Sequence, residues 1–196
     1  MLKTIYLIDI NKDLVKYWKK FFINYSEVVV LEGDYFQQPA DVMVSPANSF
    51  GIMDGGIDLP IRDNLGFRVQ RNLQKEIIDN YHGELPVGSA IIIKTDSKDW
   101  PFLVSAPTMR VPEDVSFTLN PYLAFRAALL EVIKFNKVND KKLTSLVCCG
   151  MGTGYGHVHP KRCAALMRAA YQTMLAPSRI PSFSSIHEFH YSLQTS

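Results

Sequence analysis

Short apolar runs alternate with longer amphipathic segments along the chain. The runs are rich in β-branched residues and favour buried strands, whereas the amphipathic segments repeat apolar residues at helical spacing, as Leu14, Val15 and Trp18 do. The predicted strands are 4–10, 27–31, 41–45, 89–95, 102–106, 146–149 and 185–191, and the predicted helices are 12–24, 59–81 with a break near Gly66, 121–136 and 160–175.

This alternation predicts an α/β fold: a three-layer α/β/α sandwich in which helices cover both faces of a mixed, largely parallel central sheet. No linker, repeat or low-complexity segment interrupts the pattern, so we expect one domain over residues 1–196. Its first strand and helix, at about 1–24, form an extra β-α unit. The Pro- and Ser-containing stretch 177–185 is expected to be a loop.

Composition narrows the functional classes. Hydrophobic residues make up 47% of the 196 residues and charged residues 20%, which excludes a disordered chain. Lys and Arg number 21 against 19 Asp and Glu, so the net charge of +2 predicts no large nucleic-acid-binding surface. The apolar run at 4–10 is too short for a signal sequence or a membrane span, so we expect a soluble, cytoplasmic protein without membrane contact.

Cysteine and histidine spacing offers no metal site or disulfide framework. Cys148 and Cys149 are sequence neighbours, and neither they nor Cys163 follow a CxxC spacing, which favours buried thiols in a reducing compartment. His157 and His159 form an HxH pair, but no third ligand accompanies them. We therefore expect neither a metal nor a cofactor.

Two glycine-bearing loops directly follow predicted strands, at 46–58 and at 150–156. In parallel sheets ligands bind beyond the carboxyl ends of the strands, and glycines let backbone N–H groups approach an anion closely. Either loop alone is equally consistent with a tight turn. Two such loops in one domain favour a diphosphate, and Gly154 in the second is expected to have a positive φ.

Five short motifs occur in a characteristic order between about residues 27 and 191. They are Gly-Asp-Tyr at 33–35, Val-Ser-Pro-Ala-Asn-Ser at 44–49, Asp-Gly-Gly-Ile-Asp at 54–58, Leu-Pro-Val-Gly at 85–88 and Gly-Thr-Gly-Tyr-Gly at 152–156. This order resembles the macro domain family, whose members bind ADP-ribose.

The chain departs from that family in three respects, one of which is the β-α unit at 4–24, where many members begin with a β-hairpin. Asp54-Gly55-Gly56 stands where the family has three glycines, and Ser45-Pro46 replaces its first Asn-Ala. The additional carboxylate of Asp54 would repel a diphosphate or narrow the space for a water molecule.

The resemblance implies roles along ADP-ribose. Ionised Asp34 would accept from adenine N6, unless it caps a turn, and the Asn48 amide would bind the distal ribose, unless it forms an Asx turn before Phe50. Tyr155 would shield the diphosphate and distal ribose from water, and Phe189 or Tyr191 would stack on adenine. The implied ADP-ribose-binding residues are Asp34, Tyr35, Asn48, Gly55, Gly56, Ile57, Gly152, Thr153, Gly154, Tyr155, Gly156, Phe189 and Tyr191.

The same resemblance implies that Asp58 is catalytic, together with Asn48. Its carboxylate would orient or activate a water, or stabilise positive charge at the anomeric carbon; the alternative is a charge favoured at a helix N-terminus. The implied function is binding of ADP-ribose and its hydrolytic release from a protein, a nucleic acid or O-acetyl-ADP-ribose. A non-catalytic ADP-ribose reader and an ADP-ribose 1″-phosphate phosphatase are the alternatives.

Overall fold

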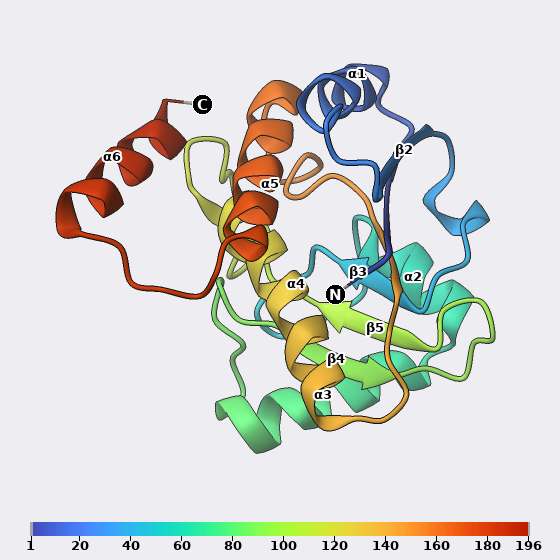
Figure 1. Ribbon diagram of the computed structural model, residues 1–196. Helices are drawn as coiled ribbons and strands as arrows, with labels where there is room; N and C mark the ends of the chain where they lie inside the picture. Colours follow the sequence, from blue (N-terminus) through green and yellow to red (C-terminus); the bar gives the residue numbers. More distant parts are fainter. Residues whose placement is uncertain (1, 196) are drawn as a thin grey trace.

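Six strands form one mixed sheet in the computed structural model, which describes residues 2–195 (Figure 1). The strands are β1 (Thr4–Asp9), β2 (Val28–Glu32), β3 (Val42–Ser45), β4 (Ile91–Lys94), β5 (Phe102–Ser105) and β6 (Ser145–Cys148). Their order across the sheet is β2-β1-β6-β3-β5-β4, and all neighbours pair in parallel except β4 with β5. The predicted fold class is confirmed.

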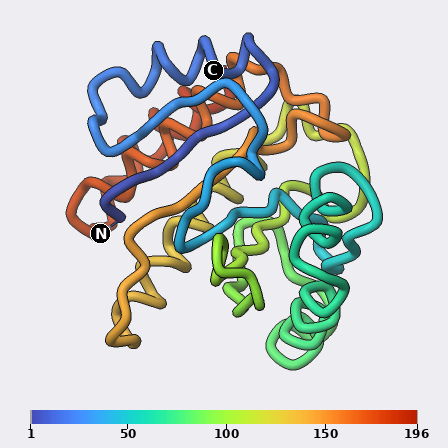
Figure 2. The backbone as a smooth tube through the Cα atoms, turned by 90° about the vertical axis from the view of Figure 1, so that its right-hand side faces the viewer, coloured from blue at the N-terminus to red at the C-terminus, as the bar shows by residue number. Residues whose placement is uncertain are grey.

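Helices cover both faces of the sheet because its inner strands are apolar on both sides. In β3, for example, Val42 and Val44 pack into the core beneath one helical layer, and Met43 packs into the core beneath the other. The first layer consists of α1 (Lys12–Phe21), α4 (Asn120–Val138) and α5 (Pro160–Leu175), and the second of α2 (Asp58–Leu65) and α3 (Arg68–Tyr81). Figure 2 shows α2 and α3 together on one side of the sheet.

The N-terminal β-α unit supplies an inner strand of the sheet. β1 lies between β2 and β6, and Ile5 is paired with Val28 on one side and with Leu146 on the other. Asn11 then caps α1, because its side chain accepts hydrogen bonds from the N–H groups of Asp13 and Leu14. Because β1, β6 and β3 pair in parallel, the carboxyl ends of all three strands lie on the same side of the molecule.

The predicted strand at 185–191 is wrong, because this segment lies within helix α6 (Phe183–Gln194). Ser182 caps the helix by accepting from Ser185 N–H, and Ile186, Phe189 and Leu193 recur at helical spacing. The alternation of aromatic and polar residues at 189–191 covers too few positions to distinguish the two-residue period of a strand from the 3.6-residue period of a helix.

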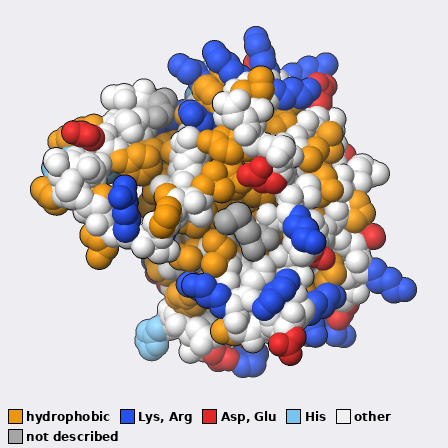
Figure 3. Space-filling model, viewed as in Figure 1, with side chains coloured by type: hydrophobic (Ala, Val, Ile, Leu, Met, Phe, Trp, Pro, Cys, Tyr) orange, Lys and Arg blue, Asp and Glu red, His pale blue; other side chains and the backbone are white. Residues whose placement is uncertain are grey.

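Helix α6 stands away from the rest of the molecule (Figure 1), and hydrophobic side chains are exposed over it (Figure 3). Of its residues only Leu193 is buried, against Leu166 and Ala169. Arg162 donates hydrogen bonds to the carbonyl groups of Leu193 and Gln194 and so fixes the end of the helix. No helix in residues 2–195 combines the length and apolar character needed to cross a bilayer.

Candidate functional site

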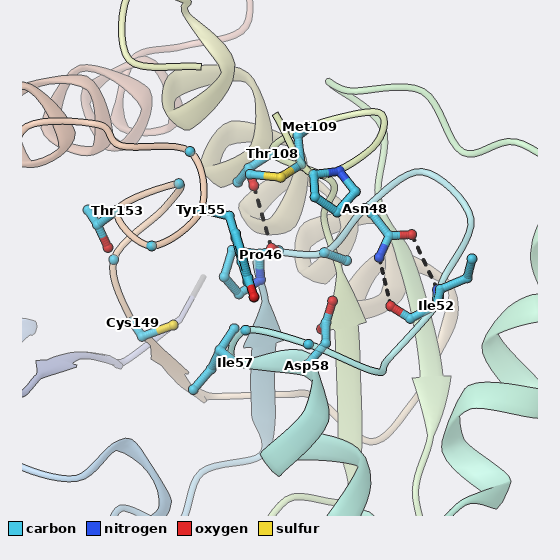
Figure 4. Close-up of a pocket in the computed structure, with 18 of the residues that line it drawn as sticks. Pro46, Asn48, Ile52, Ile57, Asp58, Thr108, Met109, Cys149, Thr153 and Tyr155 are labelled. Carbon is cyan, nitrogen blue, oxygen red and sulfur yellow. Dashed lines mark hydrogen bonds between the residues drawn. The ribbon is translucent and has the colours of Figure 1, made fainter. Parts of the chain in front are cut away.

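The carboxyl ends of β1, β6, β3 and β5 open onto a pocket of about 510 Å³ (Figure 4). Neighbouring strands lie roughly 4.8 Å apart, so this row of four spans roughly 14 Å, which gives room for an elongated ligand. The site residues predicted from sequence that line the pocket are Asn48, Gly55, Gly56, Ile57, Asp58, Gly152, Thr153, Gly154, Tyr155 and Gly156.

Asn48 shapes the loop that follows β3. Its Nδ2 donates to the Ile52 carbonyl at 2.7 Å, and its Oδ1 accepts from the N–H groups of Phe50 and Ile52 at 3.1 and 3.3 Å (Figure 4). The Asx turn considered as the alternative role is therefore present. Asn48 lines the pocket, but most of its hydrogen-bonding capacity holds the loop.

Asp58 is the first residue of α2 and is only 6% exposed, although it lines the pocket. Its carboxylate accepts a hydrogen bond from the hydroxyl of Ser45, the last residue of β3. Burial raises the pKa of Asp58 from 3.8 to about 6; the Ser45 hydrogen bond opposes this shift and the nearby charge of Asp54 adds to it. Asp58 can therefore exchange a proton near neutral pH, as a general acid or base must.

Both glycine loops present backbone N–H groups without a partner. The N–H groups of 54–57 and of 152–156 donate no hydrogen bond to any residue within the described part of the chain. Consecutive donors of this kind, beside the N-terminus of α2, are able to bind an anion.

The positive φ expected at Gly154 is found instead at Gly152, where φ is 72°. A Cβ at Gly152 would also lie 3.2 Å from the side chain of Val158, whereas a Cβ at Gly154 would meet nothing within 4 Å. The prediction for Gly154 was wrong because a Gly-x-Gly-x-Gly pattern does not identify which glycine makes the turn.

Tyr155 brings the two loops together across the pocket. Its side chain is 62% exposed, and a Cβ at Gly56 would lie 3.6 Å from the Tyr155 ring. The ring therefore lies within van der Waals reach of the backbone at Gly55 and Gly56. Figure 4 shows Tyr155 and Asp58 turned toward the same space.

Four of the predicted binding residues lie outside the set that lines this pocket. Asp34 is exposed, and its carboxylate caps the 3₁₀ helix η1 (Tyr35–Gln37) by accepting a hydrogen bond from Phe36 N–H. This is the turn cap that the sequence offered as the alternative to adenine binding. Tyr35 is buried, and its hydroxyl donates a hydrogen bond to the Val44 carbonyl at 2.6 Å. Phe189 and Tyr191 belong to α6, where Phe189 contacts Tyr122.

Asp9 is a pocket residue that the sequence analysis missed. It ends β1, and its carboxylate accepts from Gly150 N–H at 3.0 Å and from Asn11 N–H at 2.9 Å. The available signal was its place at the carboxyl end of a predicted parallel strand. Thr108 and Met109 were also missed; Met109 forms a β-bridge with Asn48, and no local motif marks either residue.

Comparison with known proteins identifies the family. The chain belongs to the macro domain family, because the family model described as Macro domain matches residues 44–167. A protein of Aquifex aeolicus (strain VF5) is 34% identical over 140 residues, which cover 71% of this chain and 76% of that protein.

Solved structures support the fold assignment. The macrodomain of Mycobacterium tuberculosis DarG is similar with a TM-score of 0.60 at 17% identity, covering 72% of this chain and 88% of that one. Thermosipho africanus DarTG in complex with ADP-ribose gives a TM-score of 0.57 at 17% identity, covering 91% of this chain and 55% of that one. At these identities the likeness shows the fold.

The raised pKa of Asp58 predicts how the effect of Asp58→Asn on stability varies with pH. Between pH 3.8 and about 6 the folded protein binds more protons than the unfolded chain, so this group's contribution to stability falls as pH rises and levels off above about 6. Asp58→Asn removes that loss. The free energy of unfolding of the variant minus that of the wild type should therefore grow by on the order of 2–3 kcal/mol from pH 4 to pH 7.5. Urea unfolding at both pH values measures it, and an unchanged difference would contradict the burial of an ionisable carboxyl.

The backbone of the second loop predicts that Gly152 and Gly154 respond differently to alanine. Gly152→Ala places a Cβ in the left-handed region and against Val158, so the free energy of unfolding should fall by about 1–3 kcal/mol. Gly154→Ala is the matched control and should change stability by less than about 0.5 kcal/mol. Thermal or urea unfolding distinguishes them; equal effects would mean that the loop adopts another conformation.

Proposed function

We propose that the protein binds ADP-ribose in this pocket and hydrolyses an ADP-ribosyl linkage. The observation that carries the proposal is the buried carboxyl of Asp58, which opens onto the pocket with a pKa of about 6 between two loops of unpaired N–H groups. Membership of the macro domain family and the fold shared with an ADP-ribose-bound neighbour support it.

The order of the strands suggests how the ligand lies. The two glycine loops follow β3 and β6 in the middle of the row, and their N–H groups would hold the diphosphate. Asp9 and Ile10 lie at the β1 end, where the Asp9 carboxylate has lone pairs left to accept from adenine N6. The distal ribose would then lie by Asn48 and Asp58.

Asp58 would act in its ionised form on a water molecule beside the anomeric carbon. The water oxygen bonds to that carbon as the bond to the acceptor breaks, and the proton taken from the water is passed to the departing acceptor. The hydrogen bond from Ser45 would hold the carboxylate in position during this transfer.

Substitution of Asp58 separates catalysis from binding. In Asp58→Ala the affinity for ADP-ribose should stay within about tenfold of the wild type. Release of ADP-ribose from a mono-ADP-ribosylated protein, from ADP-ribosylated DNA or from O-acetyl-ADP-ribose should fall by on the order of 10²–10⁴. Wild-type kcat/KM should also fall as pH drops below about 6, because Asp58 becomes protonated.

Asp63→Ala is the matched control, because Asp63 lies on the same helix and is absent from the residues lining the pocket. It should leave both binding and release unchanged. A wild type that binds ADP-ribose but releases it from none of these substrates would establish a reader in place of a hydrolase.

A further inference from the structure

The pocket is lined by carboxylates and not by cations. Three of its lining residues are aspartates, namely Asp9, Asp54 and Asp58, and none of the described lining residues is Lys, Arg or His. ADP-ribose itself carries a diphosphate, so a negatively charged lining opposes its binding unless each carboxylate has a compensating partner.

Two of the three aspartates have such partners. Asp9 accepts hydrogen bonds from two backbone N–H groups, and Asp58 accepts from the Ser45 hydroxyl. Asp54 differs: its side chain is exposed on the pocket wall, and no hydrogen bond or ion pair joins it to another residue between 2 and 195. Its charge is available for a group brought by the ligand.

The position of Asp54 indicates which part of the ligand that group belongs to. Asp54 begins the Asp-Gly-Gly turn that leads into Asp58 and α2, on the β3 side of the pocket. Only three residues separate Asp54 from Asp58 in the chain, and both line the pocket, so the two carboxyl groups lie at the same end of it. The charge of Asp54 accordingly contributes to the raised pKa of Asp58. This is the end where the proposed function puts the distal ribose and the acceptor attached to it.

We propose that Asp54 selects substrates whose anomeric carbon carries a cationic group, and that the preferred acceptor is the guanidinium of arginine. The inference rests on the proposed function and deepens it. A carboxylate accepts two parallel hydrogen bonds from a guanidinium, which gives both charge neutralisation and orientation. A neutral ester or hydroxyl acceptor would leave Asp54 without a partner.

The reaction balances with water alone. The water oxygen bonds to the anomeric carbon, the bond from that carbon to the guanidine nitrogen breaks, and the proton released from water goes to that nitrogen. The products are ADP-ribose and a free guanidinium, which Asp54 pairs with until it leaves. The pyridinium of NAD⁺ is a second source of positive charge at the same carbon.

The test compares ADP-ribosyl-agmatine, NAD⁺ and O-acetyl-ADP-ribose as substrates of the wild type, Asp54→Asn and the control Asp63→Asn. For ADP-ribosyl-agmatine, kcat/KM should fall about ten- to hundredfold in Asp54→Asn, the effect of losing a charged hydrogen-bond partner. For O-acetyl-ADP-ribose it should change by less than about threefold. Asp63→Asn should change neither. If kcat/KM for NAD⁺ also falls in Asp54→Asn, Asp54 recognises positive charge. If only kcat/KM for ADP-ribosyl-agmatine falls, Asp54 recognises the paired N–H groups of the guanidinium.

Affinity provides a second measurement that does not need turnover. In the Asp58→Ala background, ADP-ribosyl-agmatine should bind more tightly than ADP-ribose, and adding Asp54→Asn should remove that preference while leaving ADP-ribose binding equal or tighter. The inference is overturned if Asp54→Asn changes all three substrates by one factor, or if the agmatine conjugate binds no better than ADP-ribose. Absence of ADP-ribose binding in the wild type would instead overturn the proposed function.

Discussion

Parallel pairing of β1, β6, β3 and β5 is the constraint on which the rest of the site depends. Because these strands run in one direction, Asp9, Ser45, Ser105 and Cys148 all lie at or near strand ends on one edge of the sheet. The chain must turn there into helices or loops, and the turns leave N–H groups exposed. The antiparallel β4 ends at the opposite edge and contributes nothing to the pocket.

Asp58 combines two demands that oppose each other. A carboxylate at a helix N-terminus is favoured by the helix dipole, whereas burial at 6% exposure penalises its charge. The Ser45 hydroxyl relieves part of that penalty, and Asp54 adds to it. The site therefore holds the Asp58 carboxyl with a pKa of about 6. Burying this group lowers the stability of the fold, and the two apolar cores on either face of the sheet offset that loss.

Much of the fold could be predicted from local sequence. Hydrophobic periodicity marks the alternating strands and helices, and glycines mark the break near Gly66 and the two loops. α5 was predicted with its observed bounds, since Pro160 opens it. Asp9 could have been assigned from its place at the end of a predicted strand, whereas Thr108 and Met109 could not, because they reach the pocket only through the order of the strands. The segment 185–191 was misjudged since one short aromatic alternation fits both a strand and a helix face.

Titration of ADP-ribose into the purified protein by calorimetry, with AMP and ribose 5-phosphate as separate ligands, tests the central claim most directly. A ligand that spans roughly 14 Å along the row of strands uses both ends of the pocket and the donors between them. ADP-ribose should therefore bind at least about tenfold more tightly than either fragment. Equal affinity for AMP and ADP-ribose, or no binding of ADP-ribose, would contradict the account.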